Sequence, residues 1–380
     1  MNEQIACADR HEKKKNMLCP VRLGLLALGA VMICAYFALR GNHALMVCVS
    51  DNFVRPIHRF LGGLFDKLPV SMAELFYAVA VIALLVYIIY SIIQLIRRPE
   101  RLRRLYRMIL TLAAAAALFY GFFCLLWGVY YYGDSFSDRI GLDAKPVSAE
   151  QLETVTVYFA DMANRYSDRV TRDEQGSFAV GRDWILERGS SLYDNVEKTF
   201  PCLRDEMRHP KPVFFSKIMS YIEFTGFFFP FTGEANVNVD SPACMLPSTV
   251  AHELAHQRGV AKEQEANFVA VAACLESGED TFIYSAALLA YIHLGNALYK
   301  ADYSRWEQVY GSLNAQVKQD FRENSAYWDK YEGTAAGKAS DAVYESFLQS
   351  YGQTLGLQSY GACVDLLVAY YYDTALDAVR

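Results

Sequence analysis

The sequence predicts a mainly α-helical protein of the α+β class, with an N-terminal three-helix transmembrane bundle and a mostly helical domain that contains a small sheet. Three observations predict this fold. Three long uncharged apolar runs lie within the first 133 of the 380 residues. Residues 1–132 carry 15 Lys and Arg against 7 Asp and Glu, whereas residues 133–380 carry 21 against 35. Most of residues 246–380 shows helical spacing of apolar residues between glycine breaks.

Composition excludes several classes of protein. Hydrophobic residues make up 53% of the chain and charged residues 21%, which is incompatible with a disordered or collagen-like protein. Nine cysteines in a chain of this length are too few for a disulfide-based scaffold. The acidic second part argues against nucleic-acid binding, and we expect no nucleic-acid partner.

The first structural element is expected to be a membrane anchor. A helix crosses a hydrocarbon core of about 30 Å at 1.5 Å per residue, so some 20 apolar residues are needed. Trp127 and the tyrosines that follow it fit the headgroup level, where amphipathic rings gather. No small-x-small cleavage site follows the first run, so we expect an uncleaved anchor. The uncharged runs are Leu23–Leu39, Leu75–Ile96 and Met108–Gly133, and the spans are expected at about 21–39, 73–96 and 108–132.

Arginine and lysine predict the orientation of these spans. Residues 1–20 form a basic N-terminus, and six arginines lie between the second and third runs, in residues 97–107. Basic loops stay in the cytoplasm. We therefore expect both segments to be cytoplasmic and residues 133–380 to form a domain outside the cytoplasm.

The domain is expected to begin with a helix and to contain one stretch of strands. Ser148–Gln151 matches a capping box and precedes apolar residues at helical spacing. Residues 213–239 are rich in Phe, Ile, Tyr and Val, with glycine and proline breaks, and read as strands and turns. Within them, Ala235–Val239 alternates strictly and predicts a half-exposed strand. Helices are expected from Leu246 onward, with a break near Gly259.

One short motif, His252–His256, contains residue types that can bind a metal ion and transfer a proton. His252 and His256 are four residues apart on an expected helix, so both imidazoles can reach one metal ion. Glu253 lies beside the first histidine and can take a proton from a water molecule at the metal and pass it to a leaving amine.

The third metal ligand is expected from the next helix. Glu263 and Glu265 both follow Gly259, which lets the chain turn back, but only one of them can face the metal because residues two apart on a helix point about 200° apart. The small residues on the face of Glu263 favour Glu263, with Glu265 as the alternative. Asn267, one turn later, is expected to hydrogen-bond a ligand.

The residues from His252 to Asn267 resemble the gluzincin-type zinc peptidases, whose third ligand lies in an E-x-x-A-[D/N] helix. The resemblance implies a zincin-like domain with one zinc ion, a ligand role for Glu263 and a supporting role for Asn267. This chain departs from that family in its spacing, since only six residues separate His256 from Glu263. It also differs from the metzincins, because Lys262 stands where their third histidine would be.

Nearly the whole chain resembles an uncharacterised bacterial family with three spans and an HELAHQ-type domain. This resemblance implies a multi-pass protein of the bacterial inner membrane. It is carried by four short segments, namely Phe231–Asn236, Glu265–Phe268, Tyr284-Ser285 and Ser359–Gly361.

Other residues are weaker candidates. Tyr284 and Tyr360 are candidates to donate to a developing oxyanion, whereas His293 is expected to be a packed core histidine. The expected strand 235–239, with Asn236 and Asn238, is either an edge that pairs with an extended substrate or an ordinary sheet edge. A Cys202–Cys244 disulfide is compatible with an exported domain, although the pairing cannot be deduced. We expect three basic residues to be solvated charges, namely Arg258, Lys262 and Arg305.

These features predict a membrane-anchored zinc-dependent metallopeptidase that hydrolyses peptide bonds outside the cytoplasm. Its expected partners are the lipid bilayer and a peptide or protein substrate. The main alternative is a non-catalytic, membrane-tethered metal-binding or sensor module. Hydrolysis of another amide, such as a cell-wall cross-link, uses the same chemistry, whereas intramembrane proteolysis is disfavoured by the charges around the motif.

Overall fold

The computed structural model describes residues 19–206, 208–351 and 360–379. The fold is mainly helical and has one small sheet. The chain divides into two compact units. We call residues 19–54 and 74–133 the N-terminal unit, and residues 55–73 and 134–379 the main domain. The expected basic segment 1–20 lies almost wholly outside the described residues.

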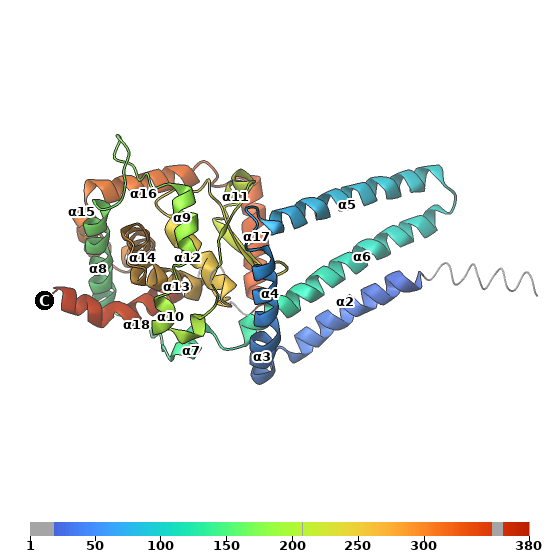
Figure 1. Cartoon of the computed structure of the whole chain (residues 1–380), viewed down its shortest axis with the longest axis horizontal. Helices are drawn as coiled ribbons and strands as arrows, with labels where there is room; N and C mark the ends of the chain where they lie inside the picture. Colours follow the sequence, from blue (N-terminus) through green and yellow to red (C-terminus); the bar gives the residue numbers. More distant parts are fainter. Residues whose placement is uncertain (1–18, 207, 352–359, 380) are drawn as a thin grey trace, which may run out of the picture. The chain divides into compact units, whose positions relative to one another are not determined.

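The N-terminal unit is built from three long apolar helices and shorter connecting helices (Figure 1). Helices α2 and α6 pack closely, because a Cβ placed on Gly29 of α2 would lie 2.6 Å from the carbonyl carbon of Ala117 in α6. The hydroxyl of Tyr36 also donates to the carbonyl oxygen of Gly128 at 3.0 Å. The elements are α2 (Pro20–Leu39), α3 (His43–Val49), η1 (Ser50–Val54), α5 (Met72–Arg97), α6 (Arg101–Leu126) and η2 (Gly128–Tyr132).

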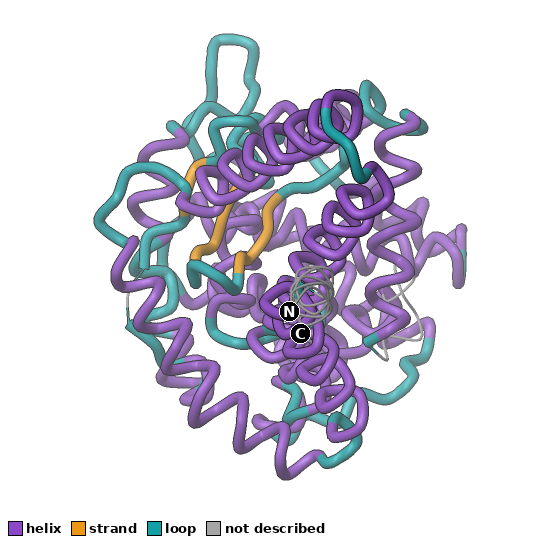
Figure 2. Tube along the Cα trace, turned by 90° about the vertical axis from the view of Figure 1, so that its right-hand side faces the viewer, coloured by secondary structure: helices purple, strands orange, loops and turns teal. Residues whose placement is uncertain are grey.

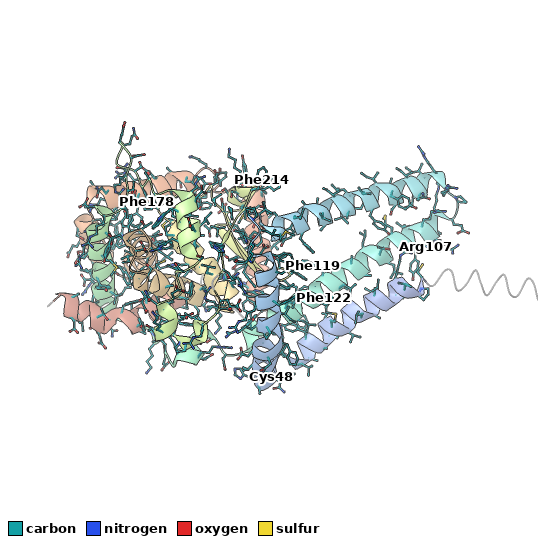
Figure 3. The ribbon with its side chains drawn as sticks, viewed as in Figure 1. Cys48, Arg107, Phe119, Phe122, Phe178 and Phe214 are labelled. Atoms are coloured by element: carbon teal, nitrogen blue, oxygen red, sulfur yellow. The ribbon has the colours of Figure 1, made fainter. Side chains whose placement is uncertain are left out.

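Within the described residues, four helices are long and apolar enough to cross a membrane, namely α2, α5, α6 and α14 (Asp280–Ala301). The first three correspond to the expected spans, although α6 begins at Arg101 and ends before a tight turn at Gly128–Tyr132. Their apolar side chains are largely exposed, as are Phe119 and Phe122 of α6, which are labelled in Figure 3. By contrast, α14 is buried along most of its length, so its apolarity serves the interior of the main domain.

Helix α14 lies at the centre of the main domain and is surrounded by α8 (Ala149–Ser167), α12 (Leu246–Gln257), α13 (Glu263–Glu276) and α18 (Tyr360–Val379). Leu288, Leu294 and Leu298 of α14 are fully buried in the main hydrophobic core. The expected capping box is confirmed, because the Ser148 hydroxyl accepts from the Gln151 amide and the Gln151 side chain accepts in return. The expected break at Gly259 is confirmed as well, at a positive φ of 85°.

Shorter elements complete the main domain around this core. They are α4 (Arg55–Phe65), α7 (Phe136–Ile140), α9 (Arg182–Gly189), α10 (Val196–Thr199), η3 (Pro201–Leu203), α11 (Ser216–Tyr221), α15 (Tyr303–Ser312), α16 (Ala315–Trp328) and α17 (Ala335–Ser350).

The sheet has three short strands in the order β1-β3-β2 (Figure 2). Strand β1 (Lys211–Pro212) is parallel to β3 (Glu234–Val237), and β2 (Gly226–Phe229) is antiparallel to β3 with Gly226 opposite Val237. The expectation of a half-exposed edge strand at Ala235–Val239 is therefore wrong. Strand β3 is central and its four residues are all buried.

The alternating pattern of β3 reflects two different buried faces. Ala235 and Val237 belong to the hydrophobic core. The Glu234 carboxylate accepts from the backbone amides of Met72 and Ala73 at 3.3 and 3.0 Å. The Ser71 hydroxyl donates to the Oδ1 atom of Asn236 at 2.6 Å. The polar face is thus satisfied by residues 71–73 rather than by solvent, which a strand pattern alone cannot reveal.

Two further expectations are corrected. Cys202 and Cys244 are both free thiols, so the disulfide considered above is absent from the described residues. Arg258 is not a solvated charge but is 4% exposed, and its guanidinium lies 3.8 Å from the ring centre of Tyr193. This cation–π contact replaces part of the hydration that burial removes.

A buried charged network joins α14 to α16, and it yields a stability prediction. The Asp320 carboxylate, whose side chain is fully buried, accepts from Arg172 Nη2 at 2.9 Å and from the Tyr284 hydroxyl. Because Asp320→Ala leaves a cation buried and unpaired, we expect the free energy of unfolding to fall by about 3–5 kcal/mol. Thermal unfolding of the full chain in detergent measures this effect. The exposed carboxylate of Glu307 provides the control, since Glu307→Ala should change it by less than about 0.5 kcal/mol.

Candidate metal centre

The candidate site begins with two histidines on one face of α12. His252 and His256 are four residues apart, and their ring centres lie 4.6 Å from each other with the rings nearly perpendicular. Their side chains are 14% and 7% exposed, so both imidazoles are largely shielded while one side stays accessible. This spacing is the arrangement that lets two imidazoles share one ion.

The turn after α12 brings the third side chain back to the histidines. The amide of Gly259 donates to the carbonyl of His256, and the amide of Val260 donates to the carbonyl of Ala255. These two bonds, with Gly259 in the left-handed region, form a Schellman motif. The chain reverses at once, so Glu263 becomes the first residue of α13 and faces α12.

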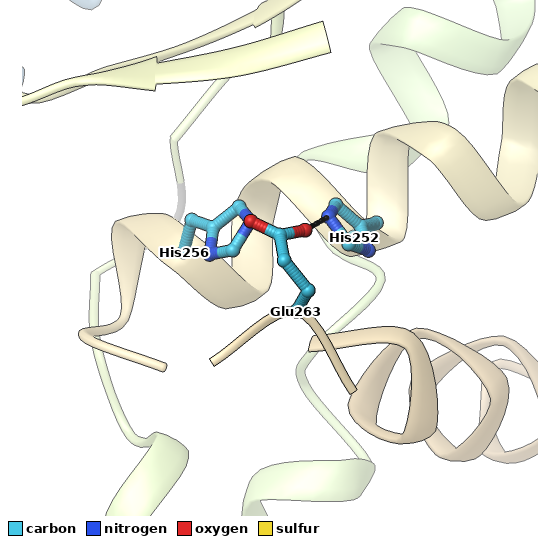
Figure 4. Close-up of side chains that lie close together, drawn as sticks. All are labelled: His252, His256 and Glu263. Carbon is cyan, nitrogen blue, oxygen red and sulfur yellow. Dashed lines mark ion pairs between the residues drawn. The ribbon is translucent and has the colours of Figure 1, made fainter. Parts of the chain in front are cut away.

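The three side chains converge on one point (Figure 4). Glu263 Oε2 lies 3.2 Å from His252 Nε2, and Glu263 Oε1 lies 3.5 Å from His256 Nε2. All three candidate ligand atoms are within 4.8 Å of one another. Ligand atoms around a tetrahedral zinc ion with bonds of 2.0–2.2 Å are roughly 3.3–3.5 Å apart, which is close to the two nitrogen–oxygen distances given above.

Each imidazole has a hydrogen-bond partner at its Nδ1 atom, while its Nε2 atom lies near Glu263. His256 Nδ1 lies 2.7 Å from the carbonyl oxygen of Val260, which can only accept, so Nδ1 carries the proton and Nε2 presents its lone pair. His252 Nδ1 lies 2.9 Å from Asn267 Oδ1, one turn after Glu263. Such partners fix the tautomer and the ring orientation of metal-binding histidines. The expected role of Asn267 therefore agrees with its position.

The electrostatics of these groups favour a positive charge between them. Burial alone lowers the pKa of His256, but the neighbouring Glu263 carboxylate outweighs burial and raises this pKa to about 9. Burial alone raises the pKa of Glu263, but His256 and His252 bring it well below its usual range. A carboxylate that faces two imidazoles favours a cation between them, either a proton on an imidazole or a metal ion.

The side chain of Glu253 is buried beside the three converging side chains. It packs against strand β2. It is 2% exposed, and its Oε2 atom has no hydrogen-bond partner among the described residues. A Cβ on Gly226 would lie 2.5 Å from Glu253 Oε1, so glycine is what permits this approach of strand and helix. Burial raises the pKa of Glu253 to about 7. A carboxyl group with a pKa near neutrality is suited to both accepting and donating a proton.

Glu265 does not face the histidines. Its carboxylate accepts from the backbone amide of Phe136 at 2.8 Å and from the Ser137 hydroxyl at 2.7 Å, at the start of α7. Lys262, expected to be a solvated charge, has its amine 3.7 Å from the same carboxylate. Of the two candidate carboxylates, only Glu263 is placed to share an ion with His252 and His256.

Most of the residues expected to contact a substrate make other contacts within the main domain. Asn236 and Asn238 are fully buried and hydrogen-bonded within the domain, to Ser71 and to Ser220 respectively. The hydroxyl of Tyr284 is engaged by Asp320, so it is not available as an oxyanion donor. The side chain of Tyr360 lies outside what the structure describes.

A cavity of about 380 Å³ opens beside the three converging side chains. His252, Glu263 and Asn267 form part of its wall, and His293, which is buried as expected, also lines it. The Oδ1 atom of Asn324 in this wall is buried and has no hydrogen-bond partner among the described residues. The apolar part of the wall consists of Pro242, Met245, Leu289, Ile292 and Trp328.

One residue at this site has no signal in the sequence. The hydroxyl of Tyr344 in α17 lies 2.5 Å from Glu263 Oε1, and its ring packs edge-to-face on Phe224, just before β2. Tyr344 is 81 residues from Glu263 and is one of 26 tyrosines. Only the fold identifies it as the tyrosine next to Glu263.

The geometry predicts which carboxylate binds metal. Glu263→Gln should weaken metal binding more than about 100-fold, beyond the 10- to 100-fold that changes in supporting residues such as Asn267→Ala typically cause. The isosteric change Glu265→Gln should leave metal content unchanged, because Glu265 contacts α7. Elemental analysis and competitive chelator titration of the full-length variants measure both effects. Equal metal content in Glu263→Gln and wild type would contradict the assignment.

The comparisons with known proteins give one result. The family model described as "Protein of unknown function (DUF3810)" matches residues 50–368. No curated protein and no solved structure matches the chain. The matched region contains α5, α6 and all three converging side chains, whereas α2 precedes it. The expectation of an uncharacterised family is confirmed, and the chain belongs to the DUF3810 family of proteins of unknown function.

Proposed function

We propose that this protein is a membrane-anchored zinc metallopeptidase whose zincin-like main domain hydrolyses peptide bonds outside the cytoplasm. The observation that carries the proposal is the convergence of His252, His256 and Glu263 with the buried carboxylate of Glu253 next to them. Two histidines and a carboxylate are the ligand set of catalytic zinc sites that keep one position open.

Each residue has a role that its surroundings support. His252, His256 and Glu263 would hold the ion, which when bound supplies a Lewis acid that polarises a carbonyl group and activates water near neutral pH. Glu253 would accept the proton of the attacking water and deliver it to the leaving nitrogen. Its burial and its pKa of about 7 suit both steps.

The sheet and the cavity offer a place for an extended peptide. Strand β2 is paired on one side by β3 and is an outer strand of the described sheet. Gly226 of β2 touches Glu253, and Thr225 lines the cavity, so a peptide running along β2 would pass the reacting groups. The apolar cavity wall would receive a side chain, and Asn324 Oδ1 would accept a substrate N–H.

Tyr344 would stabilise the reacting carbonyl oxygen. Its hydroxyl is 2.5 Å from Glu263, close to where a carbonyl polarised by the ion would lie. A donor aimed at the developing negative charge lowers the barrier of acyl transfer. Tyr284, a candidate for this role from the sequence, is engaged by Asp320 instead.

A second candidate is a metal-binding module without turnover. The contact of Tyr344 with Glu263 favours it, because a phenol at this carboxylate can also block access of a substrate to the site. The presence of Glu253 favours the enzyme, since a purely structural metal site has no use for a buried carboxylate with an unsatisfied oxygen.

The proposed membrane topology has α2, α5 and α6 as spans of a bacterial inner membrane. Six arginines in residues 97–107 favour a cytoplasmic position for the connection between α5 and α6. Three crossings then put the main domain outside. Helix α12 lies in the main domain and is not one of the apolar helices long enough to span, which disfavours intramembrane proteolysis.

Replacement of the proposed base tests the enzyme. Glu253→Gln should retain the ion, because Glu253 is not one of the three converging ligands, and should lower hydrolysis of an unstructured protein about 10²- to 10⁴-fold. Metal content and peptide release are measured on the same preparation, with His256→Ala as the variant that loses both. Metal binding by wild type without any peptide release would instead establish the binding module.

Tyr344→Phe separates the two roles of the phenol. If Tyr344 donates to the carbonyl oxygen, kcat should fall about 10²- to 10³-fold with little change in KM or metal affinity. A rise in kcat/KM would show that the phenol obstructs the site. Phe347→Leu, on the same helix, controls for loss of aromatic packing on α17.

A further inference from the structure

Helix α4 turns its apolar side away from the domain that it packs on. His58 and Gly62, one turn apart, form its buried side, with Gly62 close to Gly233 and the His58 ring against Phe228. Ile57, Phe60 and Leu64 form an apolar stripe at helical spacing on another side, and they are 42%, 70% and 59% exposed. A helix of a soluble domain normally directs such a stripe at the core.

A second apolar stripe follows strand β1 and continues on α11. Phe214 is 86% exposed, and Ile218 and Tyr221 follow it at helical spacing with more than half of each side chain exposed (Figure 3 labels Phe214). The Lys211 amine donates to the carbonyl oxygens of Asp66 and Leu68, which joins the two segments. We call the combined surface the outer apolar face, and its residues are Ile57, Phe60, Leu64, Leu68, Val70, Phe214, Phe215, Ile218 and Tyr221.

Chain connectivity restricts where this face can lie. Val70 precedes Met72, the first residue of α5, by two residues, and an extended chain reaches at most about 3.6 Å per residue. Segment 55–71 is therefore tied to the start of an apolar helix of 26 residues. Contacts of residues 71–73 with Glu234 and Asn236 fix the same segment to the main domain. Val70, at the end of the outer apolar face, therefore lies at most about 7 Å from Met72, where α5 begins. Helix α5 is long and apolar enough to cross a membrane.

We propose that the outer apolar face is a lipid-binding surface that lies in the interfacial layer of the bilayer. Phenylalanine, leucine and isoleucine on one side of a helix, with basic residues beside them, are typical of interfacial amphipathic helices. Lys67 and Lys217 are exposed in these segments and can reach lipid phosphates with their long side chains. The face holds the main domain against the membrane from which its chain emerges, whether or not the metal centre hydrolyses peptides.

Tryptophan fluorescence in vesicles tests this surface directly. The full-length variants Phe60→Trp and Phe214→Trp are reconstituted in phosphatidylcholine vesicles with and without brominated acyl chains. We call the fluorescence of a variant minus that of the wild type its added emission, which comes from the new tryptophan. Bromine on the acyl chains quenches a nearby tryptophan, and a side chain on an interfacial helix lies about 5–10 Å into the headgroup and acyl boundary. The added emission of both variants should therefore fall by roughly half or more with brominated lipid. The four native tryptophans give the same background in every variant.

Tyr303→Trp provides the matched control, since Tyr303 is 54% exposed on α15 and lies outside the outer apolar face. Its added emission should be unaffected by bromine. Unquenched added emission from both Phe60→Trp and Phe214→Trp would overturn the proposal. Emission that is blue-shifted but unquenched would also overturn it, because another protein or a second copy would then cover this face.

Discussion

The candidate site depends on the chain reversal that follows α12. Gly259 adopts a conformation that L side chains rarely tolerate, and the Schellman bonds that it permits turn the chain within five residues. The same turn aims the Val260 carbonyl at His256 and starts α13 with Glu263 facing both imidazoles. One local hydrogen-bond motif thus sets the position of Glu263, the tautomer of His256 and the approach of α13 to α12.

The short sheet affects the candidate site because its strand β2 lies very close to helix α12. Gly226 lets β2 lie directly against Glu253, which buries that carboxylate and raises its pKa toward neutrality. The polar side of β3 is satisfied by residues 71–73, so the segment that precedes α5 is part of the domain's structure. Hydrogen bonds from residues 71–73 offset part of the cost of burying this polar face, whereas an unsatisfied face would be strongly destabilising.

Apolar surface serves two different purposes in this chain. Helix α14 has the length and apolarity of a membrane span, yet it is buried at the centre of the main domain. Helix α4 is shorter and less apolar, yet it leaves Phe60 and Leu64 exposed. Hydropathy therefore identifies helices that avoid water, and only their surroundings show whether protein or lipid provides the apolar environment.

The sequence by itself determined the features that depend on neighbouring residues. Capping at Ser148, the helix end at Gly259 and the pairing of His252 with His256 all follow from spacings of seven residues or fewer, because capping bonds and helical periodicity are local. Family membership also follows from the sequence. The tertiary structure alone showed that Glu265 contacts α7, that β3 is buried and that Tyr344 lies beside Glu263. These outcomes depend on partners more than 80 residues away, such as Phe136 for Glu265, and helical spacing carries no information about such contacts.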